Sequence, residues 1–145
     1  MRGRIVLAAL AFAAVFAMSD RAGAEGAFAE GRPADIAKGG VASGMGFNYK
    51  TPTEAEVRAM DERRESTKTV ALQSLCSVVT RFHDQCIAVS MDPKAGTPGY
   101  GWAIRDTKAG AERVALVNCE RTAGPQRKGK CTVAADNSHC DGTAQ

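Results

Sequence analysis

The chain has 145 residues, of which 44% are hydrophobic and 6% aromatic, and it carries 19 basic and 16 acidic side chains. Residues 1–24 hold three arginines and one aspartate, so the rest has 16 basic and 15 acidic side chains and a net charge of only +1. This near-neutral segment has no general electrostatic reason to bind nucleic acid or a membrane surface, and its length suits one domain with a modest core.

The first 24 residues have the pattern of a secretory signal peptide. Two arginines precede an uncharged apolar run over 5–18, and Ala22-Gly23-Ala24 before Glu25 is a small-x-small cleavage site. The apolar run is shorter than the roughly 20 residues that span a bilayer, which argues against a membrane anchor. We predict cleavage between Ala24 and Glu25, a periplasmic or secreted location, and no membrane span in the mature chain. Ala27-Phe28-Ala29 is a second possible cleavage site.

Residues 25–50 are rich in Gly and Ala and contain few large apolar side chains, so we expect a flexible lead-in without a packed core. A single α+β domain is expected over 51–145. Thr51-Pro52-Thr53-Glu54 forms a capping box with proline at the first helical position, which predicts a helix start. The helix should break near 66–69, before a second apolar face over 71–75.

The next elements show the two-residue period of strands. Residues 77–82 and 86–90 are β-rich and flank a turn-like segment, which together indicate a hairpin. A third strand is expected over 100–105, a helix capped by Thr107, and a last short strand over 131–135. We therefore predict an α+β fold in which two helices pack on one face of a small antiparallel sheet.

Five cysteines follow the signal segment, namely Cys76, Cys86, Cys119, Cys131 and Cys140. In an oxidising compartment such residues form disulfides, and the odd count leaves one thiol. That thiol is either a buried, inert side chain or a reactive one. A zinc site could instead combine Cys86 with His83, or Cys140 with His139. The closely spaced cysteine pairs that structural zinc prefers are absent from the sequence, so we expect no metal.

An internal repeat appears when the chain is compared with itself at an offset of 55 residues. Gly44-Met45-Gly46-Phe47 then matches Gly99-Tyr100-Gly101-Trp102, and Cys76-Ser77-Val78 matches Cys131-Thr132-Val133. Cys119 has no counterpart in this register. The symmetry favours bridges Cys76–Cys86 and Cys131–Cys140, with Cys119 as the free thiol, while the rival pairing joins Cys119 to Cys131.

Several of these segments together resemble a known family. They are Cys76–Val89 with its two cysteines and Phe82, the Gly-Trp-Ala of 101–103, Ala111–Cys119, and Cys131-Thr132-Val133. In this order they are similar to the domain of unknown function 4189 family, whose members are small exported bacterial proteins. The resemblance covers about residues 70–140 and implies an α+β fold without an assigned activity. The family usually has a loop and an extra cysteine where Leu75 runs directly into Cys76 here, which would account for the odd count.

Few residues in the sequence suggest a catalytic or ligand-binding site. Cys86 with His83, or Cys119 with His139, could form a nucleophile and base, but nothing local in the sequence brings either pair together. Residues 121–130 form a basic loop that could meet an acidic partner or simply aid solubility. Trp102 and Tyr100 are expected to pack in the sheet. We predict no cofactor and no catalytic residue.

The sequence therefore favours an exported, disulfide-stabilised binding or interaction protein whose partner is an unknown protein or an envelope component. One alternative is an inhibitor or immunity-type protein that blocks a hydrolase through a rigid loop such as 120–130. A small cysteine- or histidine-dependent enzyme is the remaining alternative.

Overall fold

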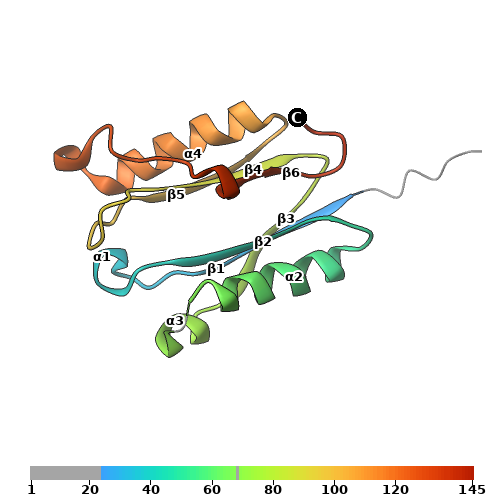
Figure 1. Ribbon diagram of the computed structural model, residues 1–145, viewed down its shortest axis with the longest axis horizontal. Helices are drawn as coiled ribbons and strands as arrows, with labels where there is room; N and C mark the ends of the chain where they lie inside the picture. Colours follow the sequence, from blue (N-terminus) through green and yellow to red (C-terminus); the bar gives the residue numbers. More distant parts are fainter. Residues whose placement is uncertain (1–23, 68) are drawn as a thin grey trace, which may run out of the picture.

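The computed structural model describes residues 24–67 and 69–145 and contains two consecutive units with the same order of elements, strand-strand-helix-strand (Figure 1). The first unit consists of β1 (Glu25–Gly31), β2 (Ala42–Tyr49), α2 (Pro52–Glu65) and β3 (Ser77–His83), with short helices α1 (Ile36–Gly39) and α3 (Val70–Ser74) in its connections. The second unit consists of β4 (Cys86–Met91), β5 (Tyr100–Arg105), α4 (Lys108–Ala123) and β6 (Ser138–Cys140), with 3₁₀ turns at Pro125–Arg127 and Ala135–Asn137. Apart from Ala24, the predicted signal peptide lies outside the described residues.

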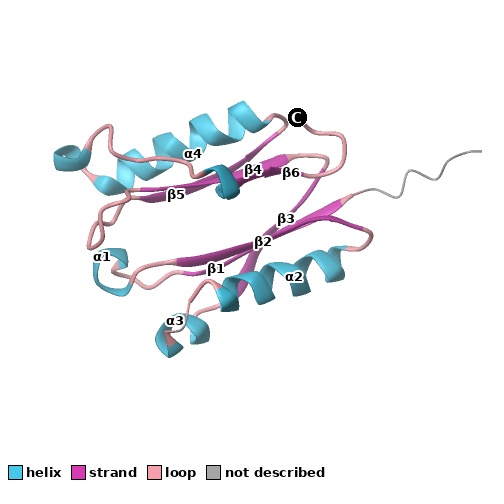
Figure 2. Cartoon of the chain, viewed as in Figure 1, coloured by secondary structure: helices cyan, strands magenta, loops and turns pink. Residues whose placement is uncertain are grey.

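The strands form two antiparallel three-stranded sheets with equivalent strand orders, β2-β1-β3 in the first unit and β5-β4-β6 in the second. The two sheets face each other, with α2 on the outer face of the first and α4 on the outer face of the second (Figures 1 and 2). The predicted α+β class is confirmed, with two sheets in place of one and a helix on each outer face. The shared order of elements and strands also agrees with the repeat found in the sequence.

The main hydrophobic core lies between the two sheets. Its buried residues come from both units and include most of the large apolar side chains: Phe28, Met45, Phe82, Ile87, Val89 and Tyr100. Trp102, partly buried at the edge of this core, packs against Phe28 with ring centroids 5.2 Å apart. Burial of these side chains is the main stabilising contribution to the sheet-on-sheet packing.

The contacts between each helix and its sheet depend on very small residues. A Cβ atom on Gly46 would lie 2.2 Å from the Ala55 carbonyl oxygen, and one on Gly101 would lie 2.4 Å from the Cys119 nitrogen. These distances are too short for any side chain, so the helix backbone can approach the strand only where glycine is present. The Gly-x-Gly repeat of the sequence thus marks the close helix contacts in both units.

The helix starts are as predicted. Thr51 and Glu54 form the reciprocal capping box of α2, and the Thr107 side chain accepts a hydrogen bond from the Gly110 N–H at the start of α4. Each of these contacts satisfies backbone donors that a helix N-terminus otherwise leaves free. The break after α2 is also present, because the helix ends at Glu65 and α3 begins at Val70.

The prediction of a flexible lead-in over 25–50 was wrong. This segment supplies β1, which is the middle strand of the first sheet, and β2 beside it. Phe28 is fully buried, as are Ala27 and Ala29 on the face of β1 that meets α2. Its Gly- and Ala-rich composition reflects the close approach of a helix, and not a lack of packing.

The predicted hairpin over 77–90 was also wrong. β3 pairs with β1, whereas β4 pairs with β5 and β6, so the short turn after His83 carries the chain from one sheet to the other. A single turn can join strands of two facing sheets as readily as strands of one sheet. The last strand is β6 at Ser138–Cys140, and only Thr132 of the expected strand forms a bridge, with Met91.

Candidate functional site

The disulfides differ from the symmetric prediction. They join Cys86 to Cys140 and Cys119 to Cys131, and Cys76 is the free cysteine. Cys76 and Cys86 cannot close a hairpin because β3 and β4 belong to different sheets, whereas Cys86 faces Cys140 directly in the β4–β6 register. The rival pairing of Cys119 with Cys131 is the one present, and it ties α4 to the segment that leads into β6. The half-buried Cys76 lies against Met60, with its Sγ 3.4 Å from the sulfur of that residue.

The two histidines do not form the proposed dyads, because Cys86 and Cys119 are both in disulfides. His83 lies at the chain reversal between the sheets, within 3.5 Å of Glu25 and 3.3 Å of Asp84. His139 stacks on Phe47, with ring centroids 4.4 Å apart. Within the described ranges, no group of three or more His, Cys, Asp or Glu residues is arranged to hold a metal ion.

The basic loop does not form one continuous surface. Arg127 makes two hydrogen bonds of 2.7 Å to the carboxylate of Asp92, whose side chain is inaccessible to solvent. This guanidinium is the main reason why the pKa of Asp92 lies well below its usual range. Glu120 accepts the N–H groups of Gly129 and Cys131 and so fixes the loop. Arg127 therefore stabilises the fold and is not available to a partner.

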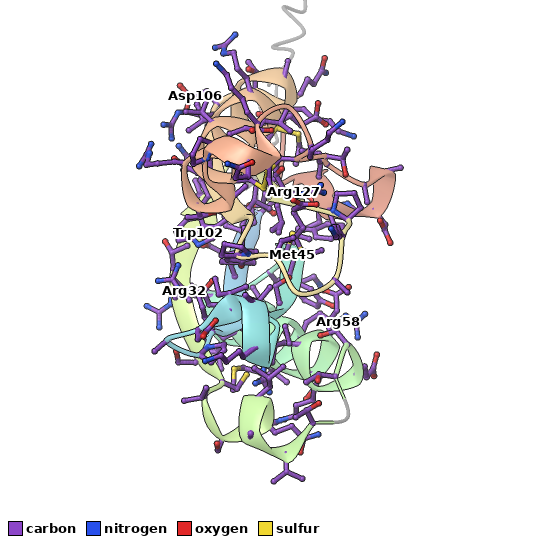
Figure 3. The ribbon with its side chains drawn as sticks, turned by 90° about the vertical axis from the view of Figure 1, so that its left-hand side faces the viewer. Arg32, Met45, Arg58, Trp102, Asp106 and Arg127 are labelled. Carbon is purple, nitrogen blue, oxygen red and sulfur yellow. A yellow bond between two sulfur atoms is a disulfide. The ribbon has the colours of Figure 1, made fainter. Side chains whose placement is uncertain are left out.

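A groove of about 470 Å³ runs along the free edge of β5, and we call it the β5-edge groove. Strand β5 forms its floor, α4 contributes Val114, Asn118, Arg121 and Thr122, and Arg32 reaches it from the segment after β1. Figure 3 shows Arg32 and Trp102 on the same side of the molecule. Pockets of this volume are typical of small-ligand sites.

The backbone acceptors on this edge are already occupied. The Thr122 hydroxyl accepts the Tyr100 N–H, and its one proton lies within reach of two carbonyls, that of Tyr100 at 2.8 Å and that of Cys119 at 2.9 Å. The Asn118 amide donates to the Trp102 carbonyl at 2.9 Å, and Arg105 donates to the Ile104 carbonyl. These contacts also protect the edge strand against pairing with another strand.

The free polar groups in the β5-edge groove are hydrogen-bond donors. The outward N–H groups of Trp102 and Ile104 have no side-chain acceptor in the described part of the chain, and they lie about 7 Å apart, two residues along one strand. Arg32, Arg105 and Arg121 add three exposed guanidinium groups, of which that of Arg121 also donates to the Asn118 side chain, and none of the described residues that line the groove is acidic.

One carboxylate lies behind the groove. Glu30 is nearly buried, accepts a hydrogen bond of 2.9 Å from the Tyr100 hydroxyl, and lies 3.7 Å from Arg32. Burial and this carboxylate raise the pKa of Tyr100 well above its usual value, so the phenol remains a neutral donor. Glu30 offsets part of the Arg32 charge, while the positive charges of Arg105 and Arg121 remain exposed to the groove.

The first unit provides an internal comparison. There the equivalent edge is β2, and the Met45 N–H donates to the Glu62 carboxylate at 2.6 Å, as the Tyr100 N–H does to Thr122 in the second unit. Glu62 also lies 3.9 Å from Arg58. An acidic side chain thus occupies the first edge, whereas a neutral hydroxyl leaves the second edge positive. This difference distinguishes the β5-edge groove from its counterpart.

Sequence reasoning identified part of this site. It named Tyr100, Trp102 and Arg121, but as sheet packing and loop charge, and it missed Arg32 and Arg105 because they lie far apart in the chain. The repeated Gly-x-Gly-aromatic pattern is the sequence signal for an edge strand beside a helix. That meaning becomes clear only from the fold of the two units.

Comparison of the chain with known proteins found a match to one family model. A family model described as Domain of unknown function (DUF4189) matches residues 17–138. No curated protein and no solved structure matches the chain. The match covers most of the chain, including strands β1 to β5 and the first residue of β6. The chain therefore belongs to the DUF4189 family, as the resemblance of its cysteine and Gly-Trp-Ala segments had implied.

Proposed function

We propose that this protein is an exported binding protein, that its ligand site is the β5-edge groove, and that its ligand carries oxyanion groups such as carboxylates or phosphates. The observation that carries the proposal is the imbalance of polar groups in the groove, where the backbone acceptors are occupied and the free groups donate. Carboxylates and phosphates accept hydrogen bonds and bind arginine in charge-assisted pairs.

The same imbalance argues against an extended peptide as ligand. A peptide that adds to a sheet edge needs alternating donors and acceptors along that edge. Here the carbonyls of Trp102 and Ile104 accept hydrogen bonds from side chains of the same chain, and the Thr122 hydroxyl lies against that of Tyr100. The two free N–H groups, about 7 Å apart, instead suit two separate anionic groups, as along a linear polymer with repeated charges.

Two features support export. The N-terminal pattern of charge, apolar run and small residues is that of a signal peptide, and the two disulfides fit an oxidising compartment. Cleavage after Ala24 would leave β1 whole, whereas cleavage after Ala29 would remove Phe28 from the core. No helix in the described residues is long and apolar enough to cross a bilayer.

The inhibitor alternative has less support from these contacts. It would use the loop over 120–130 as a contact surface, but Arg127 is bonded to Asp92 and Glu120 to the backbone of the loop itself. Fewer charged groups of this loop are therefore free to contact a hydrolase.

The proposal is tested by direct binding to three probes: inorganic polyphosphate, an oligogalacturonate and an uncharged oligosaccharide of similar length. Trp102 is the only tryptophan and lines the groove, so its fluorescence reports on occupancy. We expect the two anionic probes, or one of them, to bind and the neutral one not to bind.

A charge-matched pair of variants locates the site. The double variant Arg105→Gln, Arg121→Gln should weaken binding by about tenfold or more, since charge-assisted hydrogen bonds contribute roughly 1.5–3 kcal/mol each. The control Arg64→Gln, Arg113→Gln removes the same charge from exposed positions outside the groove. Equal weakening by both variants, or binding of the neutral probe alone, would refute the proposal.

A further inference from the structure

A buried carboxylate lies beside the predicted cleavage point. Asp141 is fully buried, and its Oδ1 accepts the Asn48 N–H at 2.6 Å. Among the described residues, its buried Oδ2 has no partner at hydrogen-bonding distance, although the backbone N–H of Asp84 also favours the charged carboxylate. An unpaired carboxylate oxygen in the interior is costly, so such a group is a strong indication of a missing partner.

The surroundings of Asp141 are acidic. Glu25 and Asp84 lie on either side of His83, at 3.5 and 3.3 Å, and among the described residues His83 is the basic side chain that contacts both of them. Glu25 and Asp84 thus share one imidazole, and Asp84 also accepts the N–H of Thr143, two residues after the buried Asp141, so this part of the structure favours an additional cation. The donor set is not arranged as a metal site among the described residues.

The Ala24–Glu25 peptide bond lies close to the segment that follows Asp141. A Cβ atom on Gly142, the residue after Asp141, would be 3.3 Å from the Cβ of Ala24. Glu25 pairs with Tyr49 and His83 in the first sheet, and Asn48, next to Tyr49, holds the Asp141 carboxylate. Asp141 is therefore connected through Gly142 and Asn48 to the residues that neighbour Ala24 and Glu25.

We propose that the Asp141 carboxylate is the binding site for the α-ammonium group of Glu25 in the mature chain. This inference rests on the export part of the proposed function. A signal peptidase would hydrolyse the Ala24–Glu25 bond with one water, leaving a carboxylate on Ala24 and an amine on Glu25. That amine takes up a proton at neutral pH, because α-amino groups titrate near pH 8. The new cation supplies the partner that Oδ2 lacks.

The consequence is a fold that becomes more stable when it is processed. Before cleavage, burial raises the pKa of Asp141 above its usual value, because removal from water disfavours the charged form. After cleavage, the ammonium pairs with the carboxylate and links β1 of the first unit to the segment after β6 of the second. The mature N-terminus would then act as a contact between the two units.

The test compares chains that start at Glu25 with a free amine and with an acetylated amine, each with Asp141 and with Asp141→Asn. Acetylation should lower the melting temperature by several degrees when Asp141 is present and by little in Asp141→Asn. The Asp35→Asn chain is the matched control, because Asp35 is exposed at the start of α1, outside this acidic cluster, and there the full effect of acetylation should remain. Equal effects of acetylation in all three backgrounds would overturn the inference.

A second measurement keeps the inference falsifiable if Asp141→Asn does not fold. The α-amine of the native chain should react with an acylating reagent at least tenfold more slowly than that of the unfolded chain. Equal rates would contradict the pairing. Mass spectrometry of the exported protein tests the processing step separately from the ion pair. An N-terminus other than Glu25 would refute cleavage after Ala24. The pairing of the Glu25 amine with Asp141 is tested by the acetylation comparison.

Discussion

Removal of the two disulfides should destabilise the protein to different extents. Cys86 and Cys140 are 54 residues apart, whereas Cys119 and Cys131 are 12 apart. In the chain-entropy model a crosslink that closes a longer loop restricts the unfolded chain more strongly. The model gives about 4.2 kcal/mol for the first bridge and about 2.8 kcal/mol for the second.

The assay is equilibrium unfolding in urea, followed by the fluorescence of Trp102, which packs on Phe28 in the core. Double alanine variants of each pair remove two sulfur atoms in both cases, so the difference between them reports mainly on the crosslinks. We expect the Cys86→Ala, Cys140→Ala protein to be less stable than the Cys119→Ala, Cys131→Ala protein by about 1.4 kcal/mol.

Cys76→Ala serves as the control, because this cysteine is not crosslinked. It should lose only its packing against Met60, within about 1 kcal/mol. The reasoning would be refuted if the two double variants were equally stable, if their order were reversed, or if Cys76→Ala cost as much as either of them.

Three further changes test single contacts. Gly101→Val should prevent native folding, as seen by circular dichroism, because a side chain there would meet the backbone of α4. Thr122→Ala should cost about 1 kcal/mol and promote concentration-dependent association in sedimentation experiments, because it uncaps the edge of β5. The pKa of Asp92 is lower in the folded protein than in the unfolded chain, where an Asp titrates near pH 4. Its pairing with Arg127 therefore stabilises the fold fully above about pH 4, and this stabilisation is lost as the pH falls further. Arg127→Gln should therefore remove part of the acid sensitivity of unfolding below pH 4.

Local signals in the sequence predicted local structure well. The capping residues Thr51 and Thr107 identified both long helices, because a cap depends on neighbours within three residues. The Gly-x-Gly repeat was visible as well, since both units need the same close contact between helix and strand. The α+β class followed from these elements.

Long-range pairing could not be predicted in the same way. The turn after His83 has the length of a hairpin turn, and nothing within it indicates that the next strand enters another sheet. The symmetric disulfide scheme depended on that hairpin and failed with it. β1 was missed because its residues are small, and the reason for their size is the helix α2, which is distant in the chain.

The candidate site depends both on residues that local patterns identify and on contacts between distant parts of the chain. Trp102 and Arg121 stand out in the sequence, but only the fold shows that Arg32 and Arg105 join them at the edge of β5. The bonds from Asn118 and Thr122 to the backbone of that edge depend on the placement of α4, which no local pattern specifies.

The central claim is that the edge of β5 binds oxyanions through its free donors. The most direct measurement is a nuclear magnetic resonance titration of the backbone amides with polyphosphate and with oligogalacturonate. The account predicts that the amide signals of Trp102 and Ile104 shift, together with the side-chain signals of Arg105 and Arg121. Shifts confined to other surfaces, such as the loop that carries Lys128, with Trp102 and Ile104 unchanged, would contradict it.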